Sequence, residues 1–227
     1  MREIPLVNDQ FYHVYNRGAD RRTIFQDNHD YSRFVTDMLY LNDSDPLSNL
    51  HRLADKSVRP RGTNNKDFRN RLVDIIAWCL MPNHFHFVLR QRQEGGISKF
   101  LQKLSAGYTK YFNLKHERSG VLLQGAFKAK HIQNDAYLTH VVRYVHINPI
   151  ALVFPDWEIR GIQNWTEALK FLDTYNWSSH LDYQGKPNFT DVLQKEFLPS
   201  YPELNERYVE FLSVLLGKEQ FLSHVRN

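Results

Sequence analysis

The stretch LVDIIAWCLMPNHFHFVLRQ, residues Leu72 to Gln91, contains two apolar runs that are separated only by Pro82-Asn83. Runs rich in β-branched and aromatic residues on either side of a two-residue turn are typical of an antiparallel β-hairpin. Side chains alternate between the two faces of a strand, so His84 and His86 share one face while the phenylalanines between them share the other. The sequence therefore predicts a hairpin with one aromatic face and one histidine face.

Further elements are expected on both sides of this hairpin, from apolar periodicity and turn residues. They are a strand over 10–18, a helix over 28–43, a helix over 96–120, a strand over 126–134 and a helix over 135–149, which Asp135 can cap and Pro149 closes. The order of elements is the split βαβ arrangement with one additional helix. The sequence predicts an α+β protein with an antiparallel sheet and helices on one face.

Residues 1–153 are predicted to form one domain, and the mostly helical residues 154–227 are predicted to form a C-terminal appendage. Within the domain, residues 44–71 form an expected mobile basic insertion that is rich in turn residues. Its last part carries five basic residues against one acid, namely Arg59, Arg61, Lys66, Arg69 and Arg71. This charge is compatible both with a solvated insertion and with a nucleic-acid contact.

Composition limits the class of protein. The 227 residues carry a formal net charge of +4, which is compatible with nucleic acid as a partner but is also common elsewhere. The single cysteine, Cys79, excludes a disulfide framework and an all-thiolate metal site. The N-terminus lacks the apolar core of a signal peptide, and the longest apolar run, IIAWCLM, is too short to span a bilayer. We therefore expect a cytoplasmic location and no membrane partner.

The paired imidazoles of His84 and His86 favour a site for a divalent cation. Two histidines on one strand face provide two ligands, and a third ligand has to come from another element. The alternative is that each histidine only forms ordinary hydrogen bonds.

The expected helix 135–149 has an apolar stripe for packing and a polar stripe on its other face. Spacings of three and four residues bring together Tyr137, His140, Tyr144 and Asn148. Folding requires only the apolar stripe, so the polar stripe is available for chemistry. Two other roles stay open, because Asn148 can cap the helix end and Tyr144 can be a packing aromatic.

Together these residues predict phosphoryl transfer from a phosphodiester to a tyrosine. A cation held by His84 and His86, with Asn148 either as a third ligand or as a residue that orients the metal, would neutralise charge on the scissile phosphate. Tyr144 would attack phosphorus, which gives a phosphotyrosine and releases a 3′-hydroxyl. The bond energy is kept in the new ester, and the chain has no G-x-x-x-x-G-K-[ST] loop, so no nucleotide cofactor is expected.

Several motifs, in this order and spacing, match a known family: YHVYNRGADRRTIF, WCLMPNHFHFVLR, GYTKYFN, LLQGAFKAKHIQ and YVHINPI, with YNWSSHLDYQG further on. The chain resembles the IS200-like single-tyrosine transposases of the HUH endonuclease superfamily, and most closely their REP-associated tyrosine transposase branch. The resemblance implies a ferredoxin-like fold, a Mg²⁺ or Mn²⁺ cofactor, and cleavage of single-stranded DNA near imperfect hairpins. It also implies that His84 and His86 are metal ligands and that Tyr144 is the nucleophile, with Asn148 one turn later.

DNA binding is expected from five basic side chains near the same sheet edge: Arg17, Arg21, Arg22, Lys128 and Lys130. Each of them, taken singly, is better explained as a solvated charge than as a DNA contact. Tyr108 and Tyr111 are rival nucleophiles by composition, but they occupy buried-looking positions of the expected helix 96–120.

Other functions remain open from the sequence. A rolling-circle replication or mobilisation nuclease would use the same histidines and a tyrosine, and Tyr137 and Tyr144 lie seven residues apart. A domesticated, non-cleaving protein that binds hairpin DNA would keep the fold. An unrelated metal hydrolase would require a carboxylate or a third histidine close to the pair, and the sequence places none nearby. Both a monomer and a homodimer are compatible with the sequence.

Overall fold

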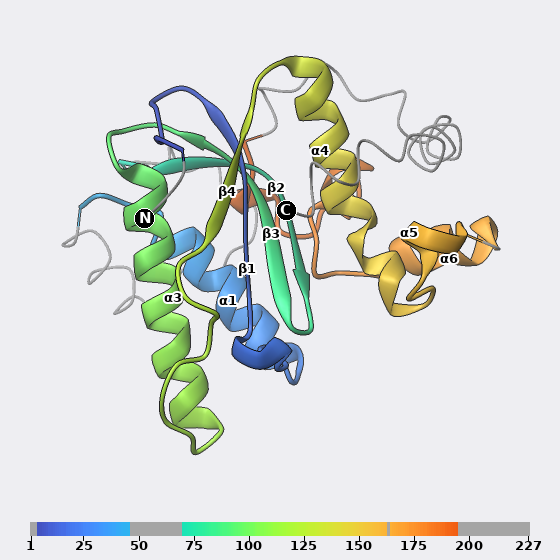
Figure 1. Cartoon of the computed structure of the whole chain (residues 1–227), viewed down its shortest axis with the longest axis horizontal. Helices are drawn as coiled ribbons and strands as arrows, with labels where there is room; N and C mark the ends of the chain where they lie inside the picture. The colour runs from blue at the N-terminus through green and yellow to red at the C-terminus, as the bar shows by residue number, and fades with distance from the viewer. Residues whose placement is uncertain (1–3, 46–69, 163, 195–227) are drawn as a thin grey trace.

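The computed structural model describes residues 4–45, 70–162 and 164–194 (Figure 1). A four-stranded antiparallel sheet has the order β2-β3-β1-β4. Its strands are β1 (Phe11–Arg17), β2 (Val73–Met81), β3 (His84–Gln91) and β4 (Lys128–Ile132). Most of the predicted basic insertion, including Arg59, Arg61, Lys66 and Arg69, lies outside the described residues, as does the chain beyond residue 194.

Three long helices accompany the sheet: α1 (Asn28–Tyr40), α3 (Gly96–Lys115) and α4 (Asp135–Ile147). Shorter helices follow, namely η2 (Asn148–Leu152), α5 (Trp157–Arg160), α6 (Trp165–Leu172), α7 (His180–Tyr183) and η3 (Thr190–Val192). The element order from β1 to α4 agrees with the sequence prediction, and this strand order is that of a split βαβ, ferredoxin-like sheet. In the part of the chain that the structure describes, no helix has the length and apolar character needed to cross a bilayer.

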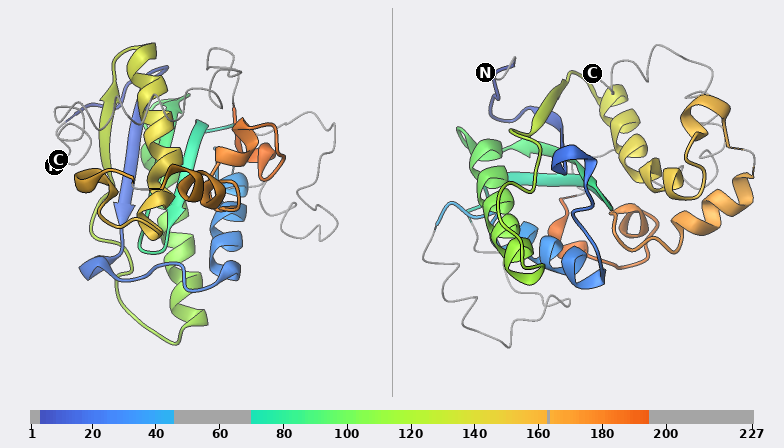
Figure 2. Two further views of the ribbon diagram at one scale, coloured as in Figure 1. Left: turned by 90° about the vertical axis from the view of Figure 1, so that its right-hand side faces the viewer. Right: turned by 60° about the horizontal axis from the view of Figure 1, so that its bottom comes forward.

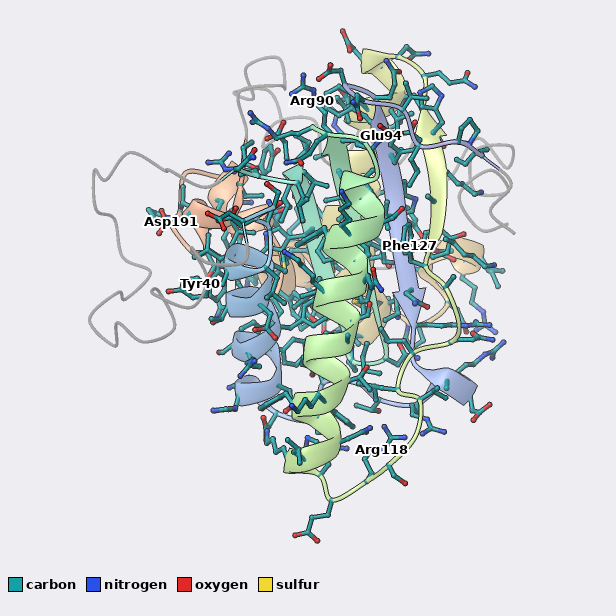
Figure 3. All side chains as sticks on the ribbon, turned by 90° about the vertical axis from the view of Figure 1, so that its left-hand side faces the viewer. Tyr40, Arg90, Glu94, Arg118, Phe127 and Asp191 are labelled. Atoms are coloured by element: carbon teal, nitrogen blue, oxygen red, sulfur yellow. The ribbon has the colours of Figure 1, made fainter. Side chains whose placement is uncertain are left out.

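The aromatic face of the sheet packs under α1 and α3 (Figure 3). Phe85 and Phe87 of β3 meet Phe34 of α1, and Tyr108 of α3 contacts the same ring of Phe34 edge-on. All four rings are completely buried, which explains why the chain is rich in aromatic residues at strand and helix spacing. This layer is the largest of the three apolar clusters among the described residues and lies on the face of the sheet opposite the histidines.

Helix α4 lies on the opposite face of the sheet (Figure 2). Its apolar stripe packs against β2 and β3, through Val141, Val142 and Val145, while Ile147 joins a separate apolar cluster with α5 and α6. The helices that share one face, as predicted, are therefore α1 and α3. The additional helix of the prediction is α4, and it covers the histidine face. The cap of α4 is Asn134, whose side chain accepts the Tyr137 backbone N–H, and the helix begins at Asp135, so the predicted cap is one residue too late.

Residues 175–194, which we call the edge segment, cover the outer edge of β2. Backbone hydrogen bonds join Leu80 N to Trp177 O and Ser179 N to Trp78 O, and Gln194 N donates to Ile75 O. A sheet edge leaves a row of backbone groups without partners, and the edge segment satisfies several of them. The predicted boundary between residues 153 and 154 stays a prediction, but this part of the predicted appendage packs directly on the sheet.

Candidate active site

His84 and His86 extend from β3 toward α4, as the alternation of the strand predicts. The two-residue turn between β2 and β3 is confirmed, because Met81 pairs with His84 across it. On the other side of β3, the strand register places Tyr15 of β1 opposite His86 and Arg17 opposite His84. The histidine pair therefore lies on an inner strand of the sheet, close to the C-terminal end of β1.

A third histidine, which the sequence did not point to, contacts this pair. His13 Nε2 lies 2.9 Å from His86 Nδ1, and the two rings stack with centroids 5.1 Å apart at 15°. Burial, and secondarily the charge of Lys130, lowers the pKa of His13 to about 3. Burial also lowers the pKa of His86 well below its usual value. Both rings are therefore neutral at physiological pH; each has one N–H and one lone pair, and their mutual hydrogen bond uses the N–H of one ring and the lone pair of the other.

His84 is held by two asparagines. Its Nδ1 lies 2.6 Å from Asn83 Oδ1 in the turn, and it also has a hydrogen bond with Asn148. Burial lowers the pKa of His84 to about 4, the bond with Asn148 opposes this shift, and the charge of Arg17 adds to it. Asn148 in turn donates its Nδ2 to the backbone oxygen of Tyr144, 3.1 Å away. Its side-chain position is thus fixed relative to both the histidine and the tyrosine.

Tyr144, which belongs to α4, lies over the two histidines of β3. Its ring meets the rings of His86 and His13 edge-on, with centroids 5.8 Å and 5.9 Å away. The four residues that the sequence predicted as catalytic, His84, His86, Tyr144 and Asn148, are brought together by β3 and the C-terminal end of α4. The prediction of this cluster from two distant motifs agrees with the geometry, and the catalytic roles themselves remain a proposal.

His84, His86 and Tyr144 line an open pocket of about 590 Å³, and Asn148 lies behind them without being one of its lining residues. Its lining residues come from β1, the hairpin turn, β3, the start of β4 and α4: Tyr15, Asn16, Arg17, Arg21, Asn83, His84, His86, Gln124, Ala126, Lys128 and Tyr144. The Tyr15 hydroxyl is buried and has no hydrogen-bond partner among the described residues. The sequence analysis did not single out Tyr15 or Gln124.

The expected DNA-binding residues divide into two groups. Arg17, Arg21 and Lys128 line the pocket, and Lys130 follows on the same face of β4, opposite His13 in the register. Arg22 instead forms an ion pair with Asp20 at 3.1 Å and is not among the lining residues. The pocket is therefore positively charged on one side.

The backbone at Gly18 packs closely against the backbone of Arg22, and this contact positions Arg17 and Arg21. A Cβ atom on Gly18 would lie 2.1 Å from the backbone oxygen of Arg22, so only glycine fits at this position. Gly18 N donates to Asn83 O at 2.8 Å, which joins the end of β1 to the hairpin turn. This contact brings Arg17 and Arg21 to the rim of the pocket.

The rival tyrosines lie elsewhere. Tyr108 is fully buried on α3 and donates its hydroxyl to Ile24 O, and Tyr111 donates to the carboxylate of Asp30. Both belong to the aromatic face of the sheet, opposite the histidines. Tyr137 is on α4 but is not among the pocket-lining residues.

The donor set suits a divalent cation. The described residues contain no group of three His, Cys, Asp or Glu side chains arranged to hold a metal. The candidate site instead has two imidazoles, His84 and His86, and the side-chain amide of Asn148, which hydrogen-bonds to His84. Asparagine is not one of the four residue types in that grouping. Imidazole nitrogens are ligands for first-row transition metals and an amide oxygen is a ligand that suits Mn²⁺ and Mg²⁺, so the mixed set fits a divalent cation without selecting one.

Residues 63–148 match a family model described as "Transposase IS200 like", a span that includes both histidines, Tyr144 and Asn148. Among solved structures, the chain is similar to one described as "Structure of the REP associates tyrosine transposase bound to a REP hairpin", with a TM-score of 0.52 and 13% sequence identity. The alignment covers 86% of this chain and 90% of that chain. A search of curated protein sequences returned no match. The family model confirms the predicted resemblance to the IS200-like transposases over residues 63–148, and the likeness to the solved structure confirms the α+β fold.

Proposed function

We propose that this chain, whose residues 63–148 match the IS200-like transposases, is a metal-dependent endonuclease and strand transferase for single-stranded DNA. In this proposal it cleaves near imperfect hairpins through a 5′-phosphotyrosine intermediate. The observation that carries the proposal is the meeting of Tyr144 with His84 and His86 in one pocket that is lined by basic side chains. A phenol, two neutral imidazoles and a cationic rim form a combination that packing alone does not require.

His84, His86 and Asn148 would hold the cation, either Mg²⁺ or Mn²⁺. When bound, it would supply positive charge to the scissile phosphate and make phosphorus more electrophilic. The neutral state of the histidines supports this role, because only a deprotonated ring nitrogen can ligate a metal. Asn148 links the metal side of the pocket to α4 through its contact with the Tyr144 backbone.

Tyr144 would be the nucleophile. Its oxygen forms a bond to phosphorus while the bond between phosphorus and the 3′-oxygen breaks, and the phenolic proton is balanced by protonation of that 3′-oxygen. The product is a phosphodiester between tyrosine and the 5′ end of the downstream fragment, so its energy is retained for strand transfer. Resealing is the reverse reaction with a new 3′-hydroxyl.

Arg17, Arg21 and Lys128 would bind the phosphates on either side of the cleaved bond. The similar solved structure is described as bound to a REP hairpin, which supports hairpin DNA as the substrate class for this chain. The same function is in keeping with a cytoplasmic location, where the DNA is accessible.

Rolling-circle initiation with two tyrosines is the weaker reading, because Tyr137 does not line the pocket with Tyr144. A protein that binds hairpins without cleaving them is a further alternative. It is disfavoured by the retention of Tyr144, His84, His86 and Asn148 in contact with one another.

The test is a covalent-adduct assay with 3′-labelled single-stranded hairpins taken from DNA that flanks the gene. With Mn²⁺ or Mg²⁺, the label is expected to migrate with the protein under denaturing conditions, and peptide mapping is expected to find the nucleotide on Tyr144. Cleavage without a protein-linked label would contradict the proposed chemistry. Hairpin binding without any cleavage would instead favour the non-cleaving alternative.

A further inference from the structure

Each of the two candidate metal ligands has the same ring nitrogen held by a neighbour. His84 Nδ1 lies 2.6 Å from Asn83 Oδ1, and His86 Nδ1 lies 2.9 Å from His13 Nε2. The two neighbours come from different elements, the hairpin turn and β1. In both rings Nδ1 has this neighbour, so Nε2 is the nitrogen that a cation would take, and His84 also has a hydrogen bond with Asn148, the third candidate ligand.

These contacts restrict where the ring protons lie. An amide oxygen only accepts hydrogen bonds, so His84 Nδ1 must donate to Asn83 and its lone pair must be on Nε2. Between His13 and His86, one nitrogen has to donate and the other has to accept. Donation from His86 Nδ1 gives His86 the same tautomer as His84, with both Nε2 lone pairs available on one side of β3.

We propose that Asn83 and His13 are positioning residues, which hold His84 and His86 in the Nδ1–H tautomer that binds a divalent cation through Nε2. This inference rests on the proposed function, because it takes the two histidines to be the ligands. Neither Asn83 nor His13 belongs to the predicted site residues. Residues that accept the second ring N–H of a metal-bound histidine fix its orientation and raise its basicity as a ligand.

Asn83 is well suited to this role because both ends of its amide are used. Its Nδ2 donates to Arg21 O at 3.3 Å, which leaves Oδ1 for His84. Its backbone oxygen accepts from Gly18 N at 2.8 Å. The turn residue is thus fixed by the end of β1, and its carbonyl is directed at the ring it orients.

His13 has no evident purpose in folding. Its side chain is buried on the face that α4 covers, where an apolar residue would pack without the cost of a polar ring. The ring instead stacks on His86 at 15° and lies 5.9 Å from the ring of Tyr144. A buried imidazole in this position is explained by its hydrogen bond to the ligand.

The first experiment measures Mn²⁺ binding to the full-length protein without DNA, from the electron paramagnetic resonance signal of the free ion. His13→Phe keeps an aromatic ring and removes the acceptor, and Asn83→Ala removes the other acceptor. Each is expected to weaken Mn²⁺ binding about 10- to 100-fold. His13→Gln and Asn83→Asp keep an acceptor oxygen. They are expected to bind Mn²⁺ more tightly than His13→Phe and Asn83→Ala, respectively. His131→Phe, a histidine on the other side of β4 that bonds to Gln10, is the matched control and is expected to bind like wild type.

The second experiment reads the tautomers without metal, from the ¹⁵N chemical shifts of the imidazoles in folded protein. Nδ1–H in both His84 and His86 supports the inference, and Nε2–H in either one overturns it. The two proposals fail differently in the binding experiment. If His84→Ala with His86→Ala abolishes Mn²⁺ binding but His13→Phe and Asn83→Ala bind like wild type, only the positioning roles are wrong. If the double histidine variant still binds Mn²⁺ normally, the proposed metal site is wrong and this inference falls with it.

Discussion

The ring of Tyr144 on α4 meets the ring of His86 on β3 edge-on, with centroids 5.8 Å apart and an interplanar angle of 88°. Tyr15 of β1 stacks on the same histidine, at 5.6 Å and 25°. Two tyrosines therefore line the pocket, Tyr144 from α4 and Tyr15 from β1. Only Tyr144 is connected through Asn148 to the other histidine, which distinguishes it as the candidate nucleophile.

Tyr144→Phe is expected to abolish the covalent protein–DNA adduct, because it removes the attacking oxygen and keeps the ring. Hairpin binding is expected to stay close to wild type in a gel-shift assay, since the basic side chains are untouched. Tyr15→Phe is the matched control in the same pocket and is expected to keep forming the adduct. An adduct that persists in Tyr144→Phe and disappears in Tyr15→Phe would transfer the nucleophile to β1.

His84→Ala combined with His86→Ala is expected to remove Mn²⁺- or Mg²⁺-dependent cleavage, as both imidazole ligands are lost. Addition of a chelator to the wild-type protein is expected to have the same effect, and the Mn²⁺ titration of cleavage measures it. His131→Ala provides a control on β4, where the ring bonds only to Gln10 at the surface. Cleavage by the double variant at the wild-type rate would remove the metal assignment.

Lys128→Ala and Arg17→Ala are each expected to weaken hairpin binding and to make it less sensitive to salt. A contact to a single-stranded phosphate releases counterions, so each lost contact reduces the slope of log K against log salt by about 0.7. Arg22→Ala, which loses an ion pair with Asp20 outside the pocket lining, is expected to leave the slope unchanged. Equal slopes for all of these variants would place the DNA elsewhere on the surface.

Ser179→Ala is expected to destabilise the fold, because two buried groups lose their partner. Ser179 Oγ lies 2.8 Å from His146 Nε2 on α4 and accepts the Trp78 backbone N–H at 2.9 Å. A buried polar group left without a partner costs about 1–3 kcal/mol of unfolding free energy. Denaturant unfolding measures the change, and Ser32→Ala on the exposed side of α1 is the control. A change as small as that of Ser32→Ala would show that this contact does not hold α4.

Acidification is expected to destabilise the edge segment through His180. Burial lowers its pKa from 6.5 to about 4, while nearby Asp173 opposes the shift and Lys186 adds to it. The unfolded chain binds a proton below pH 6.5 that the folded chain does not, so stability falls as the pH drops from 6.5 toward 4. The full effect is roughly 3 kcal/mol for this group. His180→Gln is expected to lose less stability over that window than wild type, as measured by unfolding at pH 7 and pH 5. Equal losses would show that His180 does not titrate in this way.

Local patterns were sufficient to predict much of the fold. The hairpin, the histidine face and the apolar stripe of α4 each depend on residue spacing within a single element, which the sequence states directly. The meeting of His84 and His86 with Tyr144, about 60 residues apart, was predicted from the chemistry that the residues share, and the resemblance implied the same roles. Neither motif alone determines how close these side chains lie in the folded protein.

The parts that were missed depend on how distant elements pair. His13 becomes a neighbour of His86 only through the register of β1 on β3, and 73 residues separate them along the chain. Placing α4 on the opposite face from α1 and α3 also requires knowledge of the whole sheet. Arg21 and Arg22 were both expected near the same sheet edge; Arg21 lines the pocket and Arg22 pairs with Asp20, and the DNA-binding role of each stays a prediction.

The edge segment has a consequence for the design of a fusion protein that carries this fold. A fragment that stops at residue 153 would keep the histidines and Tyr144, but it would lose Tyr183, which donates to Ile76 O, and the backbone bonds to β2. The bared strand would then present its amides and carbonyls to strands of neighbouring molecules, a common route to insoluble protein. A stable fragment therefore has to extend at least to Gln194, which bonds to Ile75 near the start of β2.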